Sequence, residues 1–266
     1  ELHNNVVPLI KQDFPNVKIF GSENMLEMEG ASNNYPYFYH HAITNSATID
    51  NIDIFAVHGY SDGLAPTSGS KLAESWTNHL EQFATPKNKK TWMTETSGYL
   101  ESWNNSTTRP GALSLALDMH AAFYYGNASA WVWWQGSSLS TINEFNLMKG
   151  TTEVGKKYAI SKHFFRYIRP GAKRVEAVSS DDNNIFVTAY THATKATTTI
   201  VVINAGSTDK NIYVDGNGLA ETFNMYRTNA TTENCNLVST ITKGAANAFT
   251  IPAKTVLTLQ AGGDPL

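Results

Sequence analysis

Lys89-Lys90-Thr91-Trp92-Met93-Thr94-Glu95-Thr96-Ser97-Gly98-Tyr99 is a short apolar run that ends on a carboxylate and opens into a glycine-containing loop. Such a run is typical of a buried strand, bounded by turn residues. The strand places Glu95 at its carboxyl end, directly before the loop. In parallel β/α folds, catalytic side chains lie at such strand ends. The stretch therefore predicts both a parallel sheet and a position for chemistry on it.

Similar apolar runs recur along the first half of the chain, with helical periodicity between them. The runs occupy residues 17–20, 52–57, 91–94 and 130–134, and the helical patterns occupy 35–43, 71–83 and 111–125. The run starts are spaced by 35, 39 and 39 residues, a repeating β-then-α unit. A doubly wound sheet would fit this rhythm. The long loops after each run favour instead the C-terminal rim of a (β/α)8 barrel, of which four units would be present.

The pattern changes after a helical stretch at 152–167, where Arg169-Pro170-Gly171 interrupts it. Alternating segments rich in Thr and Val follow at short intervals, at 185–190, 197–203, 211–214, 222–226 and 255–259. Such segments, separated by Asp, Asn and Gly turns, predict an all-β sandwich. We therefore expect an α/β domain over 1–169 and a β-sandwich domain over 170–266.

Composition excludes several classes of function. The chain has 20 basic and 23 acidic residues and a net charge of -3, without the basic cluster that nucleic-acid binding requires. No apolar run is long enough to span a bilayer. The single Cys235 forms no internal disulfide, and no Cys/His spacing resembles a zinc site. We expect no nucleic-acid or membrane partner, no metal and no cofactor.

The aromatic and amide content suits a neutral sugar ligand. The chain has 6 Trp and 12 Tyr residues, and aromatic faces stack on sugar rings while amides bind hydroxyls. Many secreted β-proteins share this composition, so it only favours carbohydrate. The opening residues 1–14 lack the basic start and apolar core of a signal peptide, so they give no direct sign of export.

Glu95, His58 and Tyr60 form the main candidate site. Glycoside hydrolysis needs one carboxylate that attacks the anomeric carbon and a second that protonates the leaving oxygen, and Glu95 is a candidate for the first. His58-Gly59-Tyr60 ends the preceding run, so its side chains would face the same rim. They would hold Glu95 ionised or bind a sugar hydroxyl. The alternatives are a surface glutamate that ends a strand and a histidine that is only a satisfied polar group.

Trp131-Val132-Trp133-Trp134-Gln135 follows in the fourth run. Strand alternation sends Trp131 and Trp133 to one side and Trp134 to the other. At least one of these rings is expected to form the floor of a sugar subsite, and one or two to fill the core. The neighbouring polar and aromatic candidates for substrate binding are Tyr99 and Gln135.

The chain resembles glycoside hydrolase family 30, in its bacterial xylanase branch. The stretches that carry the resemblance run in family order: KIFGSEN (18–24), DIFAVHGYSDG (53–63), KKTWMTETSGY (89–99), ASAWVWWQ (128–135), KHFFRYIRPGAKRVEA (162–177), NIFVTAY (184–190) and IPAKTVLTL (251–259). The resemblance implies a (β/α)8 barrel with a β-sandwich at its side and hydrolysis of a β-linked polysaccharide with retention. It places Glu95 on the nucleophile, and His58, Tyr60, Trp133 and Trp134 around the cleaved sugar.

Two departures from the family pattern set further expectations. Xylanases that need glucuronate branches have an arginine after the tryptophans, where this chain has Gln135-Gly136-Ser137-Ser138, so activity should not need that branch. The family's first four β/α units, which would supply the acid/base, have no counterpart. Glu23 matches the family's fifth-strand loop and is not expected to replace that acid/base.

Two classes of function stay open from the sequence. One is a retaining, endo-acting glycosidase on β-1,4-xylan, or on the β-1,6-galactan or β-1,6-glucan of other relatives, that is incompetent without a completing N-terminal half or chain. The other is a carbohydrate-binding or scaffold protein that has lost catalysis. The family resemblance implies a secreted or cell-surface location in either case.

Overall fold

The computed structural model describes residues 2–21, 23–26, 37–44, 46–60 and 66–263. The chain divides into two compact units. Unit 1 comprises Glu1–Ser61, Ser68–Ser97 and Ala121–Trp134, and unit 2 comprises Asp62–Thr67, Gly98–His120 and Gln135–Leu266. The domain boundary that the sequence predicts near residue 170 stays a prediction.

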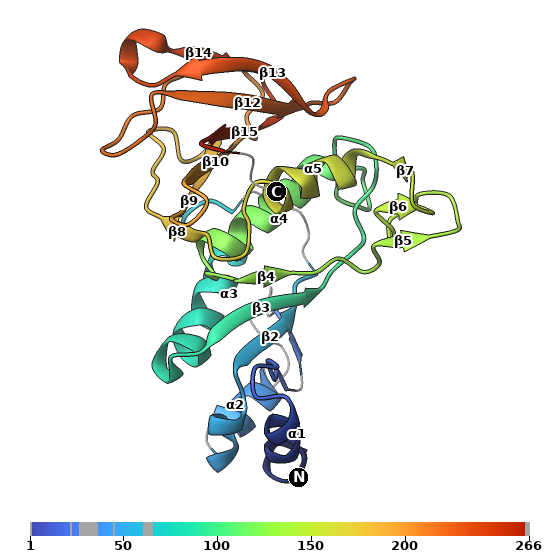
Figure 1. Cartoon of the computed structure of the whole chain (residues 1–266). Helices are drawn as coiled ribbons and strands as arrows, with labels where there is room; N and C mark the ends of the chain where they lie inside the picture. The colour runs from blue at the N-terminus through green and yellow to red at the C-terminus, as the bar shows by residue number, and fades with distance from the viewer. Residues whose placement is uncertain (1, 22, 27–36, 45, 61–65, 264–266) are drawn as a thin grey trace. The chain divides into compact units, whose positions relative to one another are not determined.

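A parallel four-stranded sheet organises unit 1 (Figure 1). Its strands, in spatial order, are β1 (Asn24–Met25), β2 (Ile54–His58), β3 (Lys90–Glu95) and β4 (Ala130–Trp131). Each strand pairs in parallel with the next. The parallel β/α arrangement that the spacing predicted is therefore confirmed.

The strand predicted at 17–20 is wrong. Phe20 makes only an isolated bridge to Ile54, and β1 begins later, at Asn24. The Asp53 carboxylate accepts from the Ile19 backbone N–H at 2.8 Å and from the Lys11 ammonium at 2.8 Å. A side chain thus replaces the neighbouring strand as the acceptor for this N–H group.

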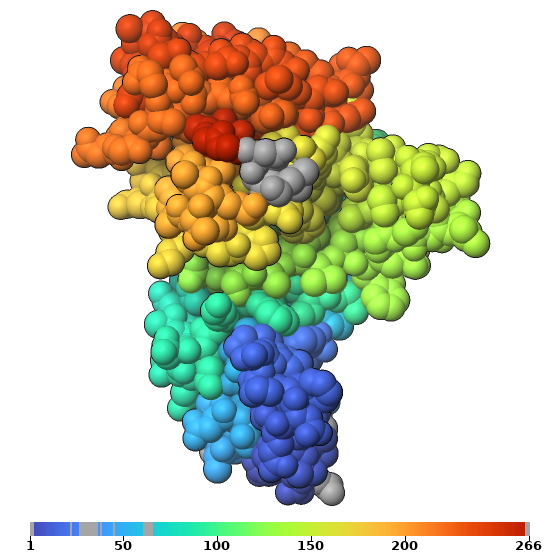
Figure 2. Space-filling model, in the orientation of Figure 1, coloured from blue at the N-terminus to red at the C-terminus, as the bar shows by residue number. Residues whose placement is uncertain are grey.

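Short helices precede and connect the strands of unit 1. They are η1 (Leu2–Val6), α1 (Val7–Asp13), α2 (Phe38–Thr44), η2 (Ala47–Asn51), α3 (Lys71–His79), η3 (Leu80–Ala84) and η4 (Thr85–Lys87). The N-cap of α3 is Ser70, whose hydroxyl accepts from the Ala73 N–H at 3.3 Å. η1 contacts η2, and the dark-blue and light-blue surfaces of these segments adjoin in Figure 2. The apolar side chains between sheet and helices include Phe55, Val57, Trp76, Phe83 and Met93.

The longest helix of the predicted rhythm is α4 (Ala112–Tyr124), within the 111–125 pattern. The later helical pattern corresponds to α5 (Lys156–Phe165) in unit 2. Within the described ranges, neither these helices nor any other has the length and hydrophobicity needed to traverse a bilayer.

Unit 2 is built on an antiparallel six-stranded sheet. Its strands, in spatial order, are β13 (Asn234–Thr242), β12 (Thr222–Thr228), β15 (Thr255–Ala261), β10 (Thr197–Asn204), β9 (Ile185–His192) and β8 (Lys173–Val175). A second sheet pairs β11 (Lys210–Ile212) with β14 (Phe249–Ile251), and a small third sheet contains β5 (Ser137–Ser138), β6 (Met148–Lys149) and β7 (Glu153–Val154). The five strands predicted beyond residue 170 are observed, whereas β8, β13 and β14 were not predicted.

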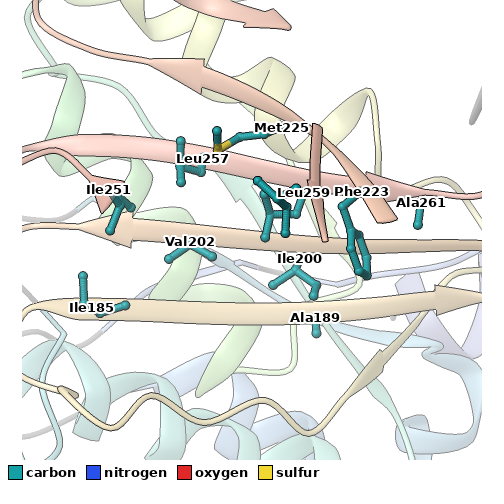
Figure 3. Close-up of a cluster of buried hydrophobic side chains, with 11 residues drawn as sticks. Ile185, Ala189, Ile200, Val202, Phe223, Met225, Ile251, Leu257, Leu259 and Ala261 are labelled. Atoms are coloured by element: carbon teal, nitrogen blue, oxygen red, sulfur yellow. The ribbon is translucent and has the colours of Figure 1, made fainter. Parts of the chain in front are cut away.

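One apolar cluster forms the core of the large sheet (Figure 3). Alternate residues of β10 and β15, including Ile200, Val202, Leu257 and Leu259, point into it. Phe223 from β12 joins them. Strand alternation explains this selection, because residues two apart share a face.

Candidate active site

Three strand ends meet at one edge of the unit 1 sheet. The pairing brings Met25 beside His58, and His58 beside Glu95. The backbone connection continues past the strands, since the Gly59 N–H donates to the Glu95 carbonyl at 2.9 Å. Carboxyl ends of parallel strands deliver their side chains to a common rim, so β2 and β3 place His58 and Glu95 together.

Glu95 has a polar neighbour for each of its carboxylate oxygens. The Tyr60 hydroxyl donates to Oε1 at 2.6 Å. Nε2 of His58 lies 3.7 Å from Oε2, which is an ion-pair distance rather than a hydrogen bond. The sheet therefore brings together the three residues that the sequence predicted as the centre of the site.

The surroundings of Tyr60 favour its neutral, donating form. Partial burial raises the pKa of Tyr60, and the hydrogen bond to Glu95 and the negative charge of that carboxylate raise it further. The Ser97 hydroxyl acts in the opposite direction. A tyrosine that stays protonated keeps its O–H directed at the carboxylate across the ordinary pH range.

A second carboxylate lies in the same place. Oε1 of Glu23 is 3.6 Å from Nε2 of His58 and accepts a hydrogen bond from the Thr94 hydroxyl at 2.6 Å. Thr94 is a residue that sequence reasoning missed, because alternation turns neighbours in a strand to opposite faces. The pairing of β2 with β3 slips between Val57 and His58, and this irregularity is invisible in the sequence.

The tryptophans of the fourth strand divide as alternation predicts. Trp131 and Trp133 are buried and stacked, with ring centroids 6.0 Å apart. Trp133 is 7% exposed and Trp134 is 54% exposed. The backbone N–H of Trp134 donates to the Thr96 carbonyl at 2.8 Å, and this bond holds Trp134 beside the segment after Glu95. Of the two candidates, Trp134 therefore has the ring that a ligand can reach.

The other two candidate residues, Tyr99 and Gln135, belong to unit 2. Tyr99 is fully buried, whereas Gln135 is exposed. The Gln135 backbone pairs with Phe145 and Leu147, which closes the loop between them. Among the described ranges, no group of three His, Cys, Asp or Glu side chains could hold a metal ion.

The arrangement in unit 1 places a carboxylate at a strand end, beside a tyrosine hydroxyl that donates to it and an exposed aromatic ring. Such a carboxylate can act as a nucleophile or as a base, and the ring can stack on an apolar or sugar surface.

Comparison with known proteins relates this chain to xylan-degrading enzymes. Glucuronoxylanase XynC of Bacillus subtilis is 32% identical over 144 residues, which are 53% of this chain and 32% of that protein. No protein-family model matches the chain.

Solved structures with the same fold include two from bacteria. A GH30 endoxylanase from Clostridium papyrosolvens C71 has a TM-score of 0.73 and 22% identity, over 98% of this chain and 59% of that one. A conserved exported protein from Bacteroides fragilis has a TM-score of 0.72 and 19% identity, over 96% and 58% of the two chains. This chain therefore spans little more than half the length of these proteins. The xylanase relative and these structural neighbours confirm the similarity to glycoside hydrolase family 30, in its xylanase-like branch, that the motifs around Glu95 predicted.

Proposed function

We propose that this chain carries the nucleophile half of a retaining, endo-acting glycoside hydrolase, with Glu95 as the nucleophile. The observation that carries the proposal is the hydrogen bond from Tyr60 to Glu95 at 2.6 Å, at the end of a parallel strand. It leaves the second oxygen of Glu95 beside His58. The xylanase relative and the GH30 neighbours support the same reaction class.

The chemistry follows from the carboxylate. An oxygen of Glu95 attacks the anomeric carbon, the bond to the leaving oxygen breaks, and a covalent glycosyl-enzyme forms. Water then releases the sugar with retained configuration. The first step requires a second carboxyl group about 5–5.5 Å from the nucleophile to protonate the leaving oxygen.

The second carboxyl group comes, in this proposal, from residues beyond this chain. Completion by an N-terminal barrel half or another chain is supported by three exposed apolar side chains of unit 1: Met25 is 52% exposed, Val132 49% and Trp134 54%. β1 is also an edge strand of the sheet, and edge strands present unpaired backbone groups. Glu23 is already engaged by Thr94 and His58, so it is a poor candidate for the acid.

In this proposal, residues 1–169 form the last four units of a (β/α)8 barrel, and residues 170–266 form a β-sandwich side domain. Trp134, which is 54% exposed, lines the sugar subsite of unit 1, with the buried Trp133 behind it. Tyr99 is fully buried and is not a subsite residue in this proposal. The substrate is β-1,4-xylan, and the protein acts outside the cell, which fits the exported structural neighbour.

The proposed xylanase does not depend on glucuronate branches. Residues 132–147 contain no Arg or Lys. Arg109 approaches this loop from elsewhere in unit 2, but its Nη2 already lies 3.3 Å from Oε1 of Glu144. A branch carboxylate would have to displace Glu144 to gain a bidentate partner. Once the acid/base half is supplied, product yields from decorated and undecorated xylan should therefore agree, and a strong preference for the acidic polymer would contradict this part of the proposal.

The test of the nucleophile uses a substrate that needs no acid. Dinitrophenolate leaves without protonation, so a chain without its acid/base should cleave 2,4-dinitrophenyl β-xylobioside yet leave the xylan polymer intact. Glu95→Gln should lower this cleavage at least about a hundredfold. Glu81→Gln, at an exposed glutamate of η3, is the matched control. Undiminished cleavage by Glu95→Gln would refute the assignment.

A further inference from the structure

Two carboxylates approach the same histidine nitrogen in unit 1. Nε2 of His58 lies 3.6 Å from Glu23 and 3.7 Å from Glu95. Both distances are longer than a hydrogen bond, so the two carboxylates influence this nitrogen through their charge. Their nearly equal distances make the influence of each comparable.

Glu23 is held in its place by Thr94. The hydroxyl of Thr94 donates to Oε1 of Glu23 at 2.6 Å and also lies 3.2 Å from the Val57 carbonyl oxygen. Because the register slips before His58, the Thr94 hydroxyl lies at the same rim as Glu95, the next residue in β3. The same irregularity therefore positions the second carboxylate as well as the first.

The two carboxylates differ during the proposed reaction. Glu95 loses its negative charge when one of its oxygens bonds the anomeric carbon and the leaving oxygen departs with the electron pair. Glu23 forms no bond and keeps its charge. Its charge therefore still acts on His58 when Glu95 no longer carries one.

We infer that Glu23 is a positioning residue, which acts through His58 and whose negative charge helps to set the pH range in which Glu95 reacts. This inference rests on the proposed role of Glu95 as the nucleophile. A purely structural carboxylate would affect folding or the size of the rate, but not its pH dependence.

The experiment compares the pH dependence of kcat/KM for 2,4-dinitrophenyl β-xylobioside in the wild type and in Glu23→Gln. Glutamine keeps the size and can still accept from Thr94. Removing an anion from beside Glu95 favours its deprotonation, so the acidic limb of the profile should move to lower pH, by about half a pH unit or more. Thr94→Val, which loosens Glu23 and keeps its charge, should change the profile in the same direction but less. Glu81→Gln, exposed on η3, should leave it in place.

The outcomes separate the two claims. A wild-type chain that releases no dinitrophenolate overturns the proposed function. If the wild type is active and the pH profile of kcat/KM for Glu23→Gln coincides with that of the wild type, the inference is overturned and the proposed function stands. Thermal unfolding of each variant verifies the fold, and if Glu23→Gln does not fold, the Thr94→Val profile decides in the same way.

Discussion

The hydroxyl of Tyr60 is the hydrogen-bond donor that the structure gives to Glu95, at 2.6 Å. A hydrogen bond to a charged group contributes about 1.5–3 kcal/mol. We expect Tyr60→Phe to lower kcat/KM for dinitrophenyl β-xylobioside about ten- to a hundredfold. Tyr213→Phe, at an exposed tyrosine of unit 2, is the control. A Tyr60→Phe rate within about twofold of the wild type would contradict this role.

Residue-level prediction from the sequence succeeded where it rested on strand geometry. Glu95, His58 and Tyr60 could be grouped because parallel strands end at one rim, and the structure places them in contact. The link from Glu23 to Thr94 could not be predicted, since it depends on a slip in register. Alternation placed Trp133 on the side of Trp131 and Trp134 on the other, but it could not tell which of the two sides is covered.

At the scale of elements, apolar periodicity located most strands but missed β13. In β13 (Asn234–Thr242), seven of the nine residues are exposed or partly exposed, and five of these seven are polar. Few apolar residues mark its inner face. β13 lies at the edge of its sheet and pairs only with β12. An edge strand of this kind is specified by backbone pairing, which leaves little periodic signal.

The large sheet of unit 2 depends on the apolar cluster drawn in Figure 3. Leu257 of β15 is fully buried in it. Leu257→Ala should reduce the free energy of unfolding by about 2–5 kcal/mol, because it removes buried methyl groups and leaves a cavity. Leu237→Ala, at a β13 residue that is 58% exposed, should change it by less than about 1 kcal/mol. Urea unfolding followed by circular dichroism measures both, and equal losses would show that the cluster is not the core.

His79 ends α3 inside a ring of aromatic side chains that includes Tyr37, Trp76 and Phe83. Among the described residues, neither of its ring nitrogens has a hydrogen-bond partner. Burial lowers the pKa of His79 from 6.5 to about 3. Between these two pH values His79 is protonated in the unfolded chain but neutral in the folded chain. The contribution of His79 to the free energy of unfolding is therefore fully present above pH 6.5 and is lost as the pH falls toward 3.

The corresponding prediction concerns the slope of stability with pH. Replacing His79 with Phe keeps an aromatic ring and removes the titrating group. The decline in unfolding free energy below neutral pH should become shallower by about 1.4 kcal/mol per pH unit. Urea titrations at several pH values give this slope, and the exposed His41→Gln variant should leave it unchanged. Parallel slopes for His79→Phe and the wild type would refute the account of its burial.

At the scale of the whole molecule, the repeating β/α spacing predicted a parallel sheet, and unit 1 contains one. The change to alternating Thr- and Val-rich segments predicted the antiparallel strands of unit 2. What the spacing could not predict is that Met25 and Val132 are exposed in unit 1. Apolar periodicity predicts that a face is buried, but not which segment covers it.

The central claim is that Glu95 is the nucleophile of a retaining glycosidase. The most direct measurement is covalent trapping with 2,4-dinitrophenyl 2-deoxy-2-fluoro-β-xylobioside, followed by mass spectrometry of the digested protein. Fluorine slows both steps, and the leaving group needs no acid, so the glycosyl-enzyme should accumulate. The account predicts one added glycosyl group on the peptide that contains Glu95. A label on Glu23 or on another carboxylate, or no label at all, would contradict it.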